Sequence, residues 1–256
     1  MIEQKSKKNK SFAKEIRDIV IIVVVAFFIR SFIIEPFYVP TGSLKPNILE
    51  GEYVISSKYS YGYSKYSLPW FVPLFKGRIF FSEPERGDII IFWPPGGNDR
   101  YVKRLIGLPG DKVQIIDGII HINNKPVVKT YERELTLEGN KDYIEYSEIL
   151  PNNVKYNIIE VKNPISGKKF YNTSIYNVPK GHYFFMGDNR DESGDSRGPL
   201  GFVPEENLIS KARFVWLSAQ KQLLLPTWNL LAQIPRVLEI PSWLSSIRTN
   251  RIFTSF

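Results

Sequence analysis

One serine, Ser43, stands in a short stretch whose residue types suit a nucleophile. The stretch reads Tyr38-Val-Pro-Thr-Gly-Ser-Leu-Lys-Pro46 and directly follows an apolar run. Pro40 fixes one φ angle, Gly42 allows a positive φ and Pro46 stops a helix, so the backbone here should be irregular and held by its surroundings. A linker after a helix has the same composition. Catalysis therefore requires a base, an orienting group and a substrate as well.

Lys103 is the candidate base. Neither His121 nor His182 lies in a polar turn suited to a catalytic triad, whereas Lys103 lies inside the β-type run Tyr101-Val-Lys-Arg-Leu-Ile106. Because consecutive residues of a strand point to opposite faces, one of Lys103 and Arg104 should face inward while the other reaches solvent. Burial that lowered the lysine pKa by ~3 units would leave about a third of the amines neutral at pH 7, against roughly one in 2,500 for a free lysine.

A dense polar loop, Gly187-Asp-Asn-Arg-Asp-Glu-Ser-Gly-Asp-Ser-Arg197, could aim this base. Ser193 could bond to the lysine nitrogen, and Asp195 and Arg197 are spaced to lock the loop by an ion pair. The loop also contains two arginines and lacks the last glutamate of an EF-hand, which both count against a bound cation. The alternative is a calcium site with ligands from Asp188, Asn189, Asp191 and Asp195.

The elements that must position these residues are mainly short β-strands. Branched or aromatic runs alternate with glycine, proline and aspartate turns, and Asp117-Gly118 is a tight-hairpin signal. No amphipathic helix of ten residues intervenes, which argues against parallel βαβ units. We predict a mainly β fold with an antiparallel catalytic sheet. The predicted strands cover 52–57, 88–93, 101–106, 112–116, 118–123 and 156–161.

Two further stretches are weaker signals. Residues 128–180 are more polar, and we predict an inserted β subdomain far from the chemistry. Residues 223–256 contain several leucines and two tryptophans, but Pro226, Pro235 and Pro241 cut them into pieces too short to span a bilayer. An amphipathic, interfacial or frayed tail is the expected structure.

The start of the chain predicts a membrane anchor. Residues 1–18 are rich in lysine, and Ile19-Val-Ile-Ile-Val-Val-Val-Ala-Phe-Phe-Ile29 is apolar throughout. A helix over 16–34 would be about 28 Å long at ~1.5 Å per residue, just enough to cross the hydrocarbon core. Arg30 lies near one end and can snorkel to the headgroups.

The excess of lysine before the apolar run sets the predicted topology. It places a cytoplasmic basic segment at 1–18, a transmembrane anchor at 19–35 and a catalytic β domain at 36–222 outside. A cleaved secretory signal would need small residues at its exit, where Glu35-Pro-Phe-Tyr-Val stands. A buried core helix is the other alternative.

Composition points to a membrane more than to nucleic acid. The 34 basic and 26 acidic residues give a net charge of +8, which suits either anionic partner, but no nucleic-acid-reading motif is present. The nine aromatic residues between 59 and 81 predict a loop that dips into the lipid surface or folds over the core. The absence of cysteine excludes disulfides, thiolate catalysis and cysteine-ligated zinc.

Taken together, these stretches resemble the type I signal peptidases of bacteria, which are membrane-anchored serine/lysine proteases. Tyr101-Val-Lys-Arg-Leu-Ile-Gly-Leu-Pro-Gly-Asp111 is similar to the box that holds the family's general base, and the 187–197 loop is similar to its Gly-Asp-Asn-Arg-Asp box. Anchor, boxes and order agree over residues 16–215. The resemblance implies no metal and no cofactor. The roles it implies are Ser43 as nucleophile, Lys103 as base, Ser193 as its orienter, and Asp195 with Arg197 as a brace.

The nucleophile box departs from the family pattern. The family usually shows Ser-x-Ser-Met-x-Pro-Thr-Leu, and this chain has Thr41-Gly-Ser-Leu-Lys-Pro-Asn-Ile48. Thr41 keeps the hydroxyl that the family uses to hold the oxyanion. Leu44 replaces methionine and Asn47 replaces threonine, which changes the packing behind the nucleophile.

The function implied by the resemblance is removal of N-terminal signal peptides from secreted preproteins, after small residues of the Ala-x-Ala type, through an acyl-enzyme. The expected partners are preprotein signal peptides and the lipid bilayer, not nucleic acid. The expected location is the bacterial inner membrane, with the catalytic domain on the periplasmic side. The main alternative is a non-catalytic, membrane-tethered β scaffold that binds extended peptides. A relative of self-cleaving repressors is disfavoured because no DNA-reading motif is present.

Overall fold

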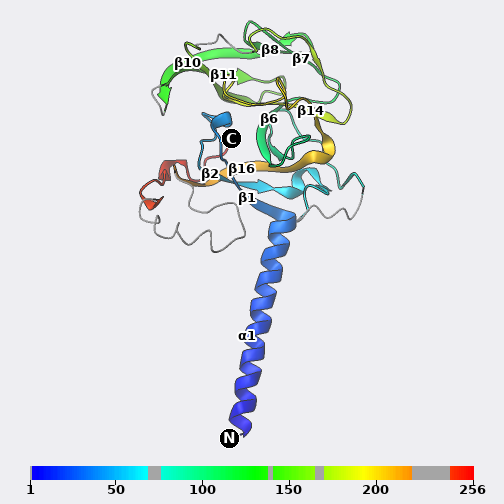
Figure 1. The fold of residues 1–256 in the computed structure, drawn as a ribbon, viewed down its shortest axis with the longest axis vertical. Coiled ribbons are helices and arrows are strands. Elements are labelled where there is room, and N and C mark those ends of the chain that lie inside the picture. Colours follow the sequence, from blue (N-terminus) through cyan, green and yellow to red (C-terminus); the bar gives the residue numbers. More distant parts are fainter. Residues whose placement is uncertain (1, 69–75, 138–140, 165–169, 221–242) are drawn as a thin grey trace.

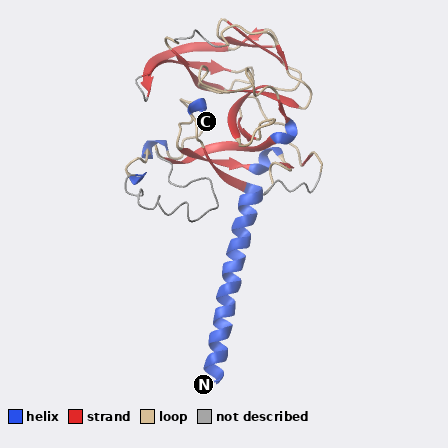
Figure 2. Ribbon diagram, viewed as in Figure 1, coloured by secondary structure: helices blue, strands red, loops and turns tan. Residues whose placement is uncertain are grey.

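The computed structural model of the chain describes residues 2–68, 76–137, 141–164, 170–220 and 243–256, with the backbone alone for 2–13. Figure 1 shows a body of stacked β-sheets from which one long helix, α1, projects. Figure 2 shows that, within these ranges, strands dominate the body and helices there are short.

The helix α1 spans Ile2–Phe28 and continues as one π-helical turn, η1, over Ile29–Ile33. Strand β1 begins directly afterwards and spans Ile34–Tyr38. The change to extended backbone follows from Pro36, because a residue before proline is disfavoured in the helical region. Among the described residues, no helix has both the length and the apolar character needed to cross a bilayer. The anchor over 19–35 stays a prediction.

The largest sheet has seven strands, and all of its neighbours pair antiparallel, which confirms the predicted antiparallel β fold. Two of its strands position the candidate site. Strand β6 carries Lys103, and β2 follows the turn that carries Ser43. In sheet order the strands are β1, β2 (Glu52–Ser57), β16 (Leu208–Ser218), β5 (Ile89–Phe92), β6 (Tyr101–Gly107), β14 (His182–Met186) and β15 (Val203–Pro204).

Smaller sheets lie beyond this one. The Asp117-Gly118 hairpin is confirmed: it joins β7 to β8, and both turn residues have positive φ, at 50° and 74°. One sheet contains β13 (Tyr176–Asn177), β7 (Lys112–Ile116), β8 (Ile119–Ile122) and β9 (Lys125–Pro126); a second contains β10 (Val128–Leu137), β11 (Lys141–Ile149) and β12 (Lys155–Val161); a third pairs β3 (Tyr63–Ser64) with β4 (Arg78–Ile79).

The prediction that residues 128–180 lie far from the chemistry is wrong. Ile159 in β12 donates its N–H to Asp188 O at 3.0 Å and accepts from Arg190 N at 2.9 Å. The free edge of β12 is thus satisfied by the 187–197 loop rather than by solvent. Sequence patterns within 128–180 could not reveal this contact, because it depends on a bridge between distant segments.

The aromatic stretch 59–81 is described except for 69–75. Tyr61 and Leu68 are buried, which confirms that part of it folds over the core. Phe80 is 82% exposed, and Tyr63 donates its hydroxyl to Phe32 O at 2.6 Å, so the stretch also lies beside η1. Whether it contacts lipid stays a prediction.

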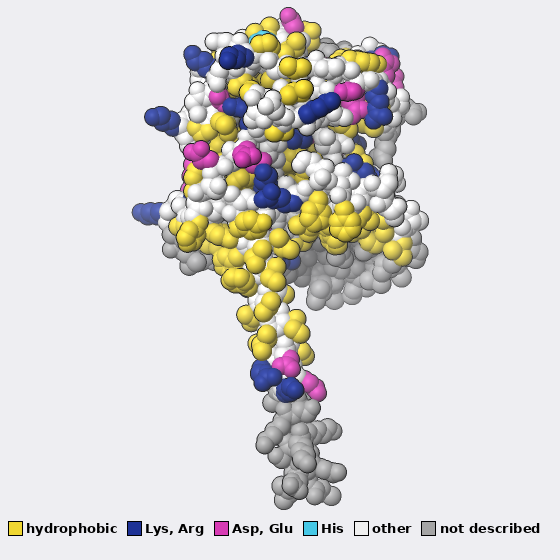
Figure 3. Space-filling model, turned by 180° about the vertical axis from the view of Figure 1, so that it is seen from behind, with side chains coloured by type: hydrophobic (Ala, Val, Ile, Leu, Met, Phe, Trp, Pro, Cys, Tyr) yellow, Lys and Arg dark blue, Asp and Glu magenta, His cyan; other side chains and the backbone are white. Residues whose placement is uncertain are grey.

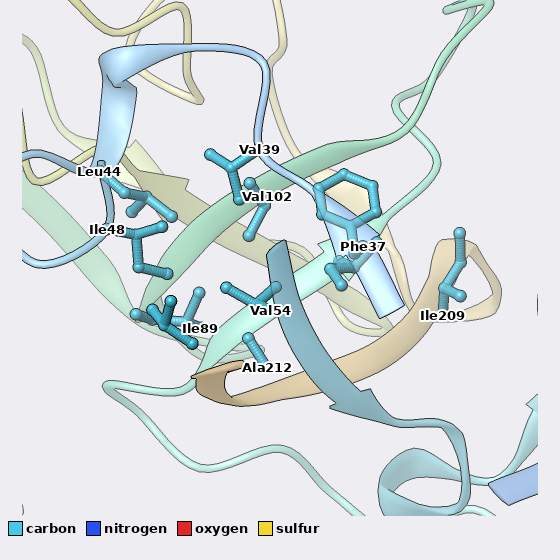
Figure 4. Packing of buried hydrophobic residues seen from close by; sticks show 11 residues of the cluster. Phe37, Val39, Leu44, Ile48, Val54, Ile89, Val102, Ile209 and Ala212 are labelled. Atoms are coloured by element: carbon cyan, nitrogen blue, oxygen red, sulfur yellow. The ribbon is translucent and has the colours of Figure 1, made fainter. Parts of the chain in front are cut away.

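An apolar cluster supports the nucleophile turn from below (Figure 4). Leu44 and Ile48, which flank the turn, are fully buried against Val54 and Val102 of β2 and β6. At ~25 cal/mol per Å² of apolar surface, each such buried aliphatic side chain contributes about 1.5–3 kcal/mol. This burial fixes the nucleophile turn to the core.

The last residues of the sequence, 243–256, pack against the main sheet, while 223–242 lie outside the described residues. Val215 of β16 donates its N–H to Thr254 O at 2.8 Å and accepts from Phe253 N at 2.6 Å. A short 3-10 helix, η6, spans Thr249–Arg251. For residues 243–256 the frayed interpretation is wrong, because these backbone bonds fix them to β16.

Candidate active site

Ser43 lies in a single 3-10 turn, η2, over Gly42–Leu44, and is 4% exposed. The Oγ of Ser43 is 2.5 Å from the Nζ of Lys103, so the two predicted catalytic residues are brought together. The hydroxyl of Thr41 lies 3.4 Å from Ser43 Oγ, on the exposed side. Asn189 holds the turn by donating its N–H to Ser43 O at 3.0 Å. The predicted irregular backbone, held by its surroundings, is confirmed.

Lys103 reaches Ser43 from the middle of β6, where it pairs in register with Ile90 of β5. The side chain is buried, at 5% exposure. Burial lowers the pKa of Lys103 to about 8, against the opposing pull of the Asp195 and Asp188 carboxylates. The amine is therefore substantially neutral at mildly alkaline pH.

Arg104 contradicts the expectation that one of the two consecutive basic residues would reach solvent. It is as buried as Lys103, at 2% exposure. On the opposite face of β6 its guanidinium donates to both carboxylate oxygens of Asp188 at 2.8 Å and to Gly87 O at 2.8 Å. Although burial disfavours the charge, the carboxylate outweighs it and raises the pKa of Arg104. The ion pair is what allows a second buried cation.

Asp195 and Arg197 form the predicted ion pair. Arg197 donates from Nε and Nη2 to the two carboxylate oxygens at 2.9 and 2.8 Å, and Gly187 N donates to the same carboxylate at 2.9 Å. Although burial opposes ionisation, Arg197 holds the pKa of Asp195 below its usual value. Since Asp188 and Asp195 each face a guanidinium, the calcium alternative for this loop is wrong.

Ser193 lies beside the nucleophile turn, but no hydrogen bond joins it to Lys103. Its buried Oγ lies beside the Asp195 carboxylate and helps to lower the pKa of that group, although the contact falls outside normal hydrogen-bond geometry. It packs on Gly187, where an added Cβ would lie 2.2 Å from Ser193 Oγ and 2.6 Å from Ser43 O. The orienting role of Ser193 stays a prediction.

Several contacts behind Ser43 were not predicted from the sequence. Asn47, which departs from the family pattern, donates its side-chain amide to Asp188 Oδ2 at 2.7 Å and to Asn157 O at 2.6 Å. Arg190 forms a buried pair with Glu148 of β11. Asp188 and Arg190 lie in the loop that contains Ser193, but Glu148 and Asn157 lie in distant strands, so the sequence carried no signal for these pairings.

A cavity of about 300 Å³ opens beside the serine and lysine. Its walls come from β1, the nucleophile turn, the start of β6 and the 187–197 loop. They include Phe37, Pro40, Thr41, Tyr101, Val102, Glu192 and Gly194. The pair is thus buried yet lies at the wall of this cavity.

The fold and the site define a mainly β protein in which a turn presents a serine to a buried, weakly basic lysine. The chain belongs to the family described as "Signal peptidase, peptidase S26", whose sequence model matches residues 12–217.

Curated relatives extend the match over nearly the whole chain. A protein named signal peptidase I from Rickettsia canadensis (strain McKiel) is 48% identical over 98% of this chain and 96% of its own. One of the same name from Rickettsia felis is 49% identical over 97% and 95%. A crystal structure of a signal peptidase I from Enterococcus faecalis V583 is 28% identical, covering 51% of this chain and 97% of that one, with a TM-score of 0.31.

Proposed function

We propose that the chain is a membrane-anchored serine endopeptidase that removes N-terminal signal peptides from secreted preproteins after small residues of the Ala-x-Ala type. The observation that carries the proposal is the 2.5 Å contact between Ser43 Oγ and Lys103 Nζ, with both side chains buried. Family membership and the names of the curated relatives support the same substrate class.

In the proposed mechanism, Lys103 is the general base. The neutral amine takes the Ser43 proton as Oγ attacks the scissile carbonyl, and the Thr41 hydroxyl and the Ser43 N–H stabilise the oxyanion. As the tetrahedral intermediate collapses, protonated Lys103 gives this proton to the leaving amine, and an acyl-enzyme remains. Lys103 then deprotonates the water that hydrolyses the ester. Only a lysine with a lowered pKa can do this near neutral pH.

The loop residues are proposed to position this base. Ser193 orients the lysine nitrogen, and the ion pair between Asp195 and Arg197 keeps the 187–197 loop rigid. The burial of that pair and its bond to Gly187 N support a bracing role. The Ser193 hydroxyl lies beside Gly187 without a hydrogen bond of normal geometry, which supports a role that is completed during the reaction.

The substrate is proposed to lie extended in the cavity beside the pair. An unwound peptide adds its backbone next to the sheet, and its small side chains fit pockets that larger ones would overfill. The modest volume of about 300 Å³ and its apolar walls at Phe37 and Val102 support this choice.

The membrane attachment is part of the proposal. We propose a cytoplasmic segment at 1–18, an anchor at 19–35 in the bacterial inner membrane, a periplasmic catalytic domain at 36–222 with 128–180 as an insertion, and an interfacial tail at 223–256. The exposed apolar side chains of α1, such as Ile22 at 66%, support it. Figure 3 shows further hydrophobic side chains gathered on the body where α1 joins it.

A cleavage assay tests the proposed function. Purified full-length protein in detergent should cut a preprotein at an Ala-x-Ala site, and Ser43→Ala should abolish turnover while leaving circular dichroism and Tm unchanged. Cleavage retained by Ser43→Ala would remove the assignment. Binding of extended peptides without any cleavage by the unmodified protein would favour the scaffold alternative.

A further inference from the structure

Glu52, at the start of β2, is a buried carboxylate outside the site described above. It is fully inaccessible to solvent and accepts the N–H of Leu49 at 2.9 Å and the hydroxyl of Ser218 at 3.0 Å. A buried carboxylate of this kind needs a cation as well, because neutral donors alone do not replace the hydration of a charge. The cation comes from η6, near the other end of the chain.

Arg251 supplies it through a two-pronged contact. Its Nε donates to one oxygen of Glu52 at 2.8 Å, and its Nη2 donates to the other at 3.1 Å. The same Nη2 also donates to the backbone carbonyl of Asn47 at 2.6 Å. The planar guanidinium makes all three bonds at once, which a lysine could not do.

The Asn47 carbonyl is four residues beyond Ser43, and this residue is held from both sides. Arg251 binds its carbonyl, while its side-chain amide donates to Asp188, the partner of Arg104. Through Asn47, the segment between Ser43 and β2 is therefore bonded both to the 187–197 loop, at Asp188, and to η6, at Arg251.

We propose that Arg251 is a positioning residue for the nucleophile: it fixes the 43–49 turn, through Glu52 and the Asn47 carbonyl, at the height where Ser43 meets Lys103. This inference rests on the proposed peptidase function. It gives residues 243–256 a role in turnover. Arg251 touches neither substrate nor reacting atoms, so its effect should fall on kcat.

The test compares Arg251→Met with the unmodified full-length protein in detergent. Cleavage of the Ala-x-Ala substrate is measured at a temperature well below the Tm of both proteins. We expect kcat to fall about tenfold with KM unchanged, since small misplacements of a reacting group cost up to ~100-fold. The midpoint of the pH profile of kcat should stay in place, because Lys103 keeps its surroundings. Arg251→Lys should retain most of the Tm and not the kcat.

Two controls separate positioning from stability. Arg86→Met breaks another largely buried pair, Arg86 with Asp111 at 2.8 Å, whose arginine bonds to Asp111 and the Ile106 carbonyl rather than to the nucleophile turn; it should lower Tm and leave kcat unchanged. The double variant Glu52→Gln with Arg251→Met removes both buried charges. Its Tm should recover, while kcat should stay low because the bond to Asn47 O is still missing.

The outcomes are distinct. If Arg251→Met keeps the unmodified kcat, or if kcat recovers together with Tm in the double variant, Arg251 only balances a charge and the inference is wrong. If the unmodified protein does not cleave, or Ser43→Ala still does, it is the proposed function that fails.

Discussion

The two faces of β6 bury the two basic residues of the strand in opposite ways. Lys103 lies at 5% exposure with its amine against a neutral hydroxyl, and burial lowers its pKa to about 8. Arg104 lies at 2% exposure with its guanidinium on the Asp188 carboxylate, and its pKa is raised. Burial is common to both. The partner decides whether a buried cation becomes reactive or becomes structural.

The two side chains also differ in their effect on the stability of the fold. A buried amine without a carboxylate partner destabilises the fold, whereas a paired guanidinium with a bond from each of its three nitrogens holds two segments together. Under the proposed function, one strand carries a residue for its chemistry beside one that stabilises the fold, and substitutions of the two should have opposite effects on stability.

The largest expected effect is that of Lys103→Met. Loss of the base should lower kcat by about 10²–10⁴-fold. The same change should raise the free energy of unfolding at neutral pH by about 3 kcal/mol, the cost of lowering the amine pKa from 10.5 to about 8. Turnover of the Ala-x-Ala substrate and urea unfolding measure the two quantities. A variant that is both inactive and less stable would show that the amine is not held at such a cost.

Arg104→Met should act in the other direction on stability. It leaves the Asp188 carboxylate buried without its cation, which should lower the free energy of unfolding by about 3–5 kcal/mol. Urea unfolding compares it with the neighbouring Lys103→Met under identical conditions. Adding Asp188→Asn should recover part of the loss. No recovery would mean that packing of the arginine against Tyr156, not charge, is what matters.

The pH profile gives a smaller effect. With the pKa of Lys103 at about 8, roughly one amine in ten is neutral at pH 7 and about nine in ten at pH 9, so kcat should rise about tenfold between them. The sign for stability is the same: the unfolded chain binds more protons between pH 8 and 10.5, so stability should also rise there. A kcat that falls over pH 7 to 9 would be incompatible with a lysine base.

The smallest expected effect is that of Asn47→Thr. Threonine keeps one donor for Asp188 but loses the bond to Asn157 O, which should cost about 1 kcal/mol. The shift in Tm measures it, with Asn152→Thr on an exposed turn as the control. A shift as large as that of Arg104→Met would place Asn47 among the main supports of the buried pair.

The sequence allowed most of the strands to be predicted for local reasons. Branched residues define β6, alternation predicts that one of Lys103 and Arg104 faces inward, and the Asp117-Gly118 pair requires the positive φ values that are found. Ser43 and Lys103 were brought together by resemblance of the surrounding boxes, not by any pattern that encodes their distance. What is local in the chain was predictable.

The contacts that failed prediction are those between distant segments. The burial of Arg104 depends on Asp188, 84 residues away, and alternation alone would send it to solvent. The approach of β12 to the 187–197 loop depends on a bridge between Ile159 and Asn189. The docking of η6 depends on Glu52, almost two hundred residues earlier. None of these contacts produces a periodic pattern in the sequence.

The crowding at Gly187 has a consequence for motion. Atoms of Ser193 and of the Ser43 carbonyl occupy the space that a side chain at 187 would need, so the backbones of the loop and the turn are in direct contact. Neither can swing outward without carrying the other along. The amide of Asn189, which bonds across this junction, should therefore exchange with deuterium only when both segments open together. Ser43 and the 187–197 loop should therefore move as one unit.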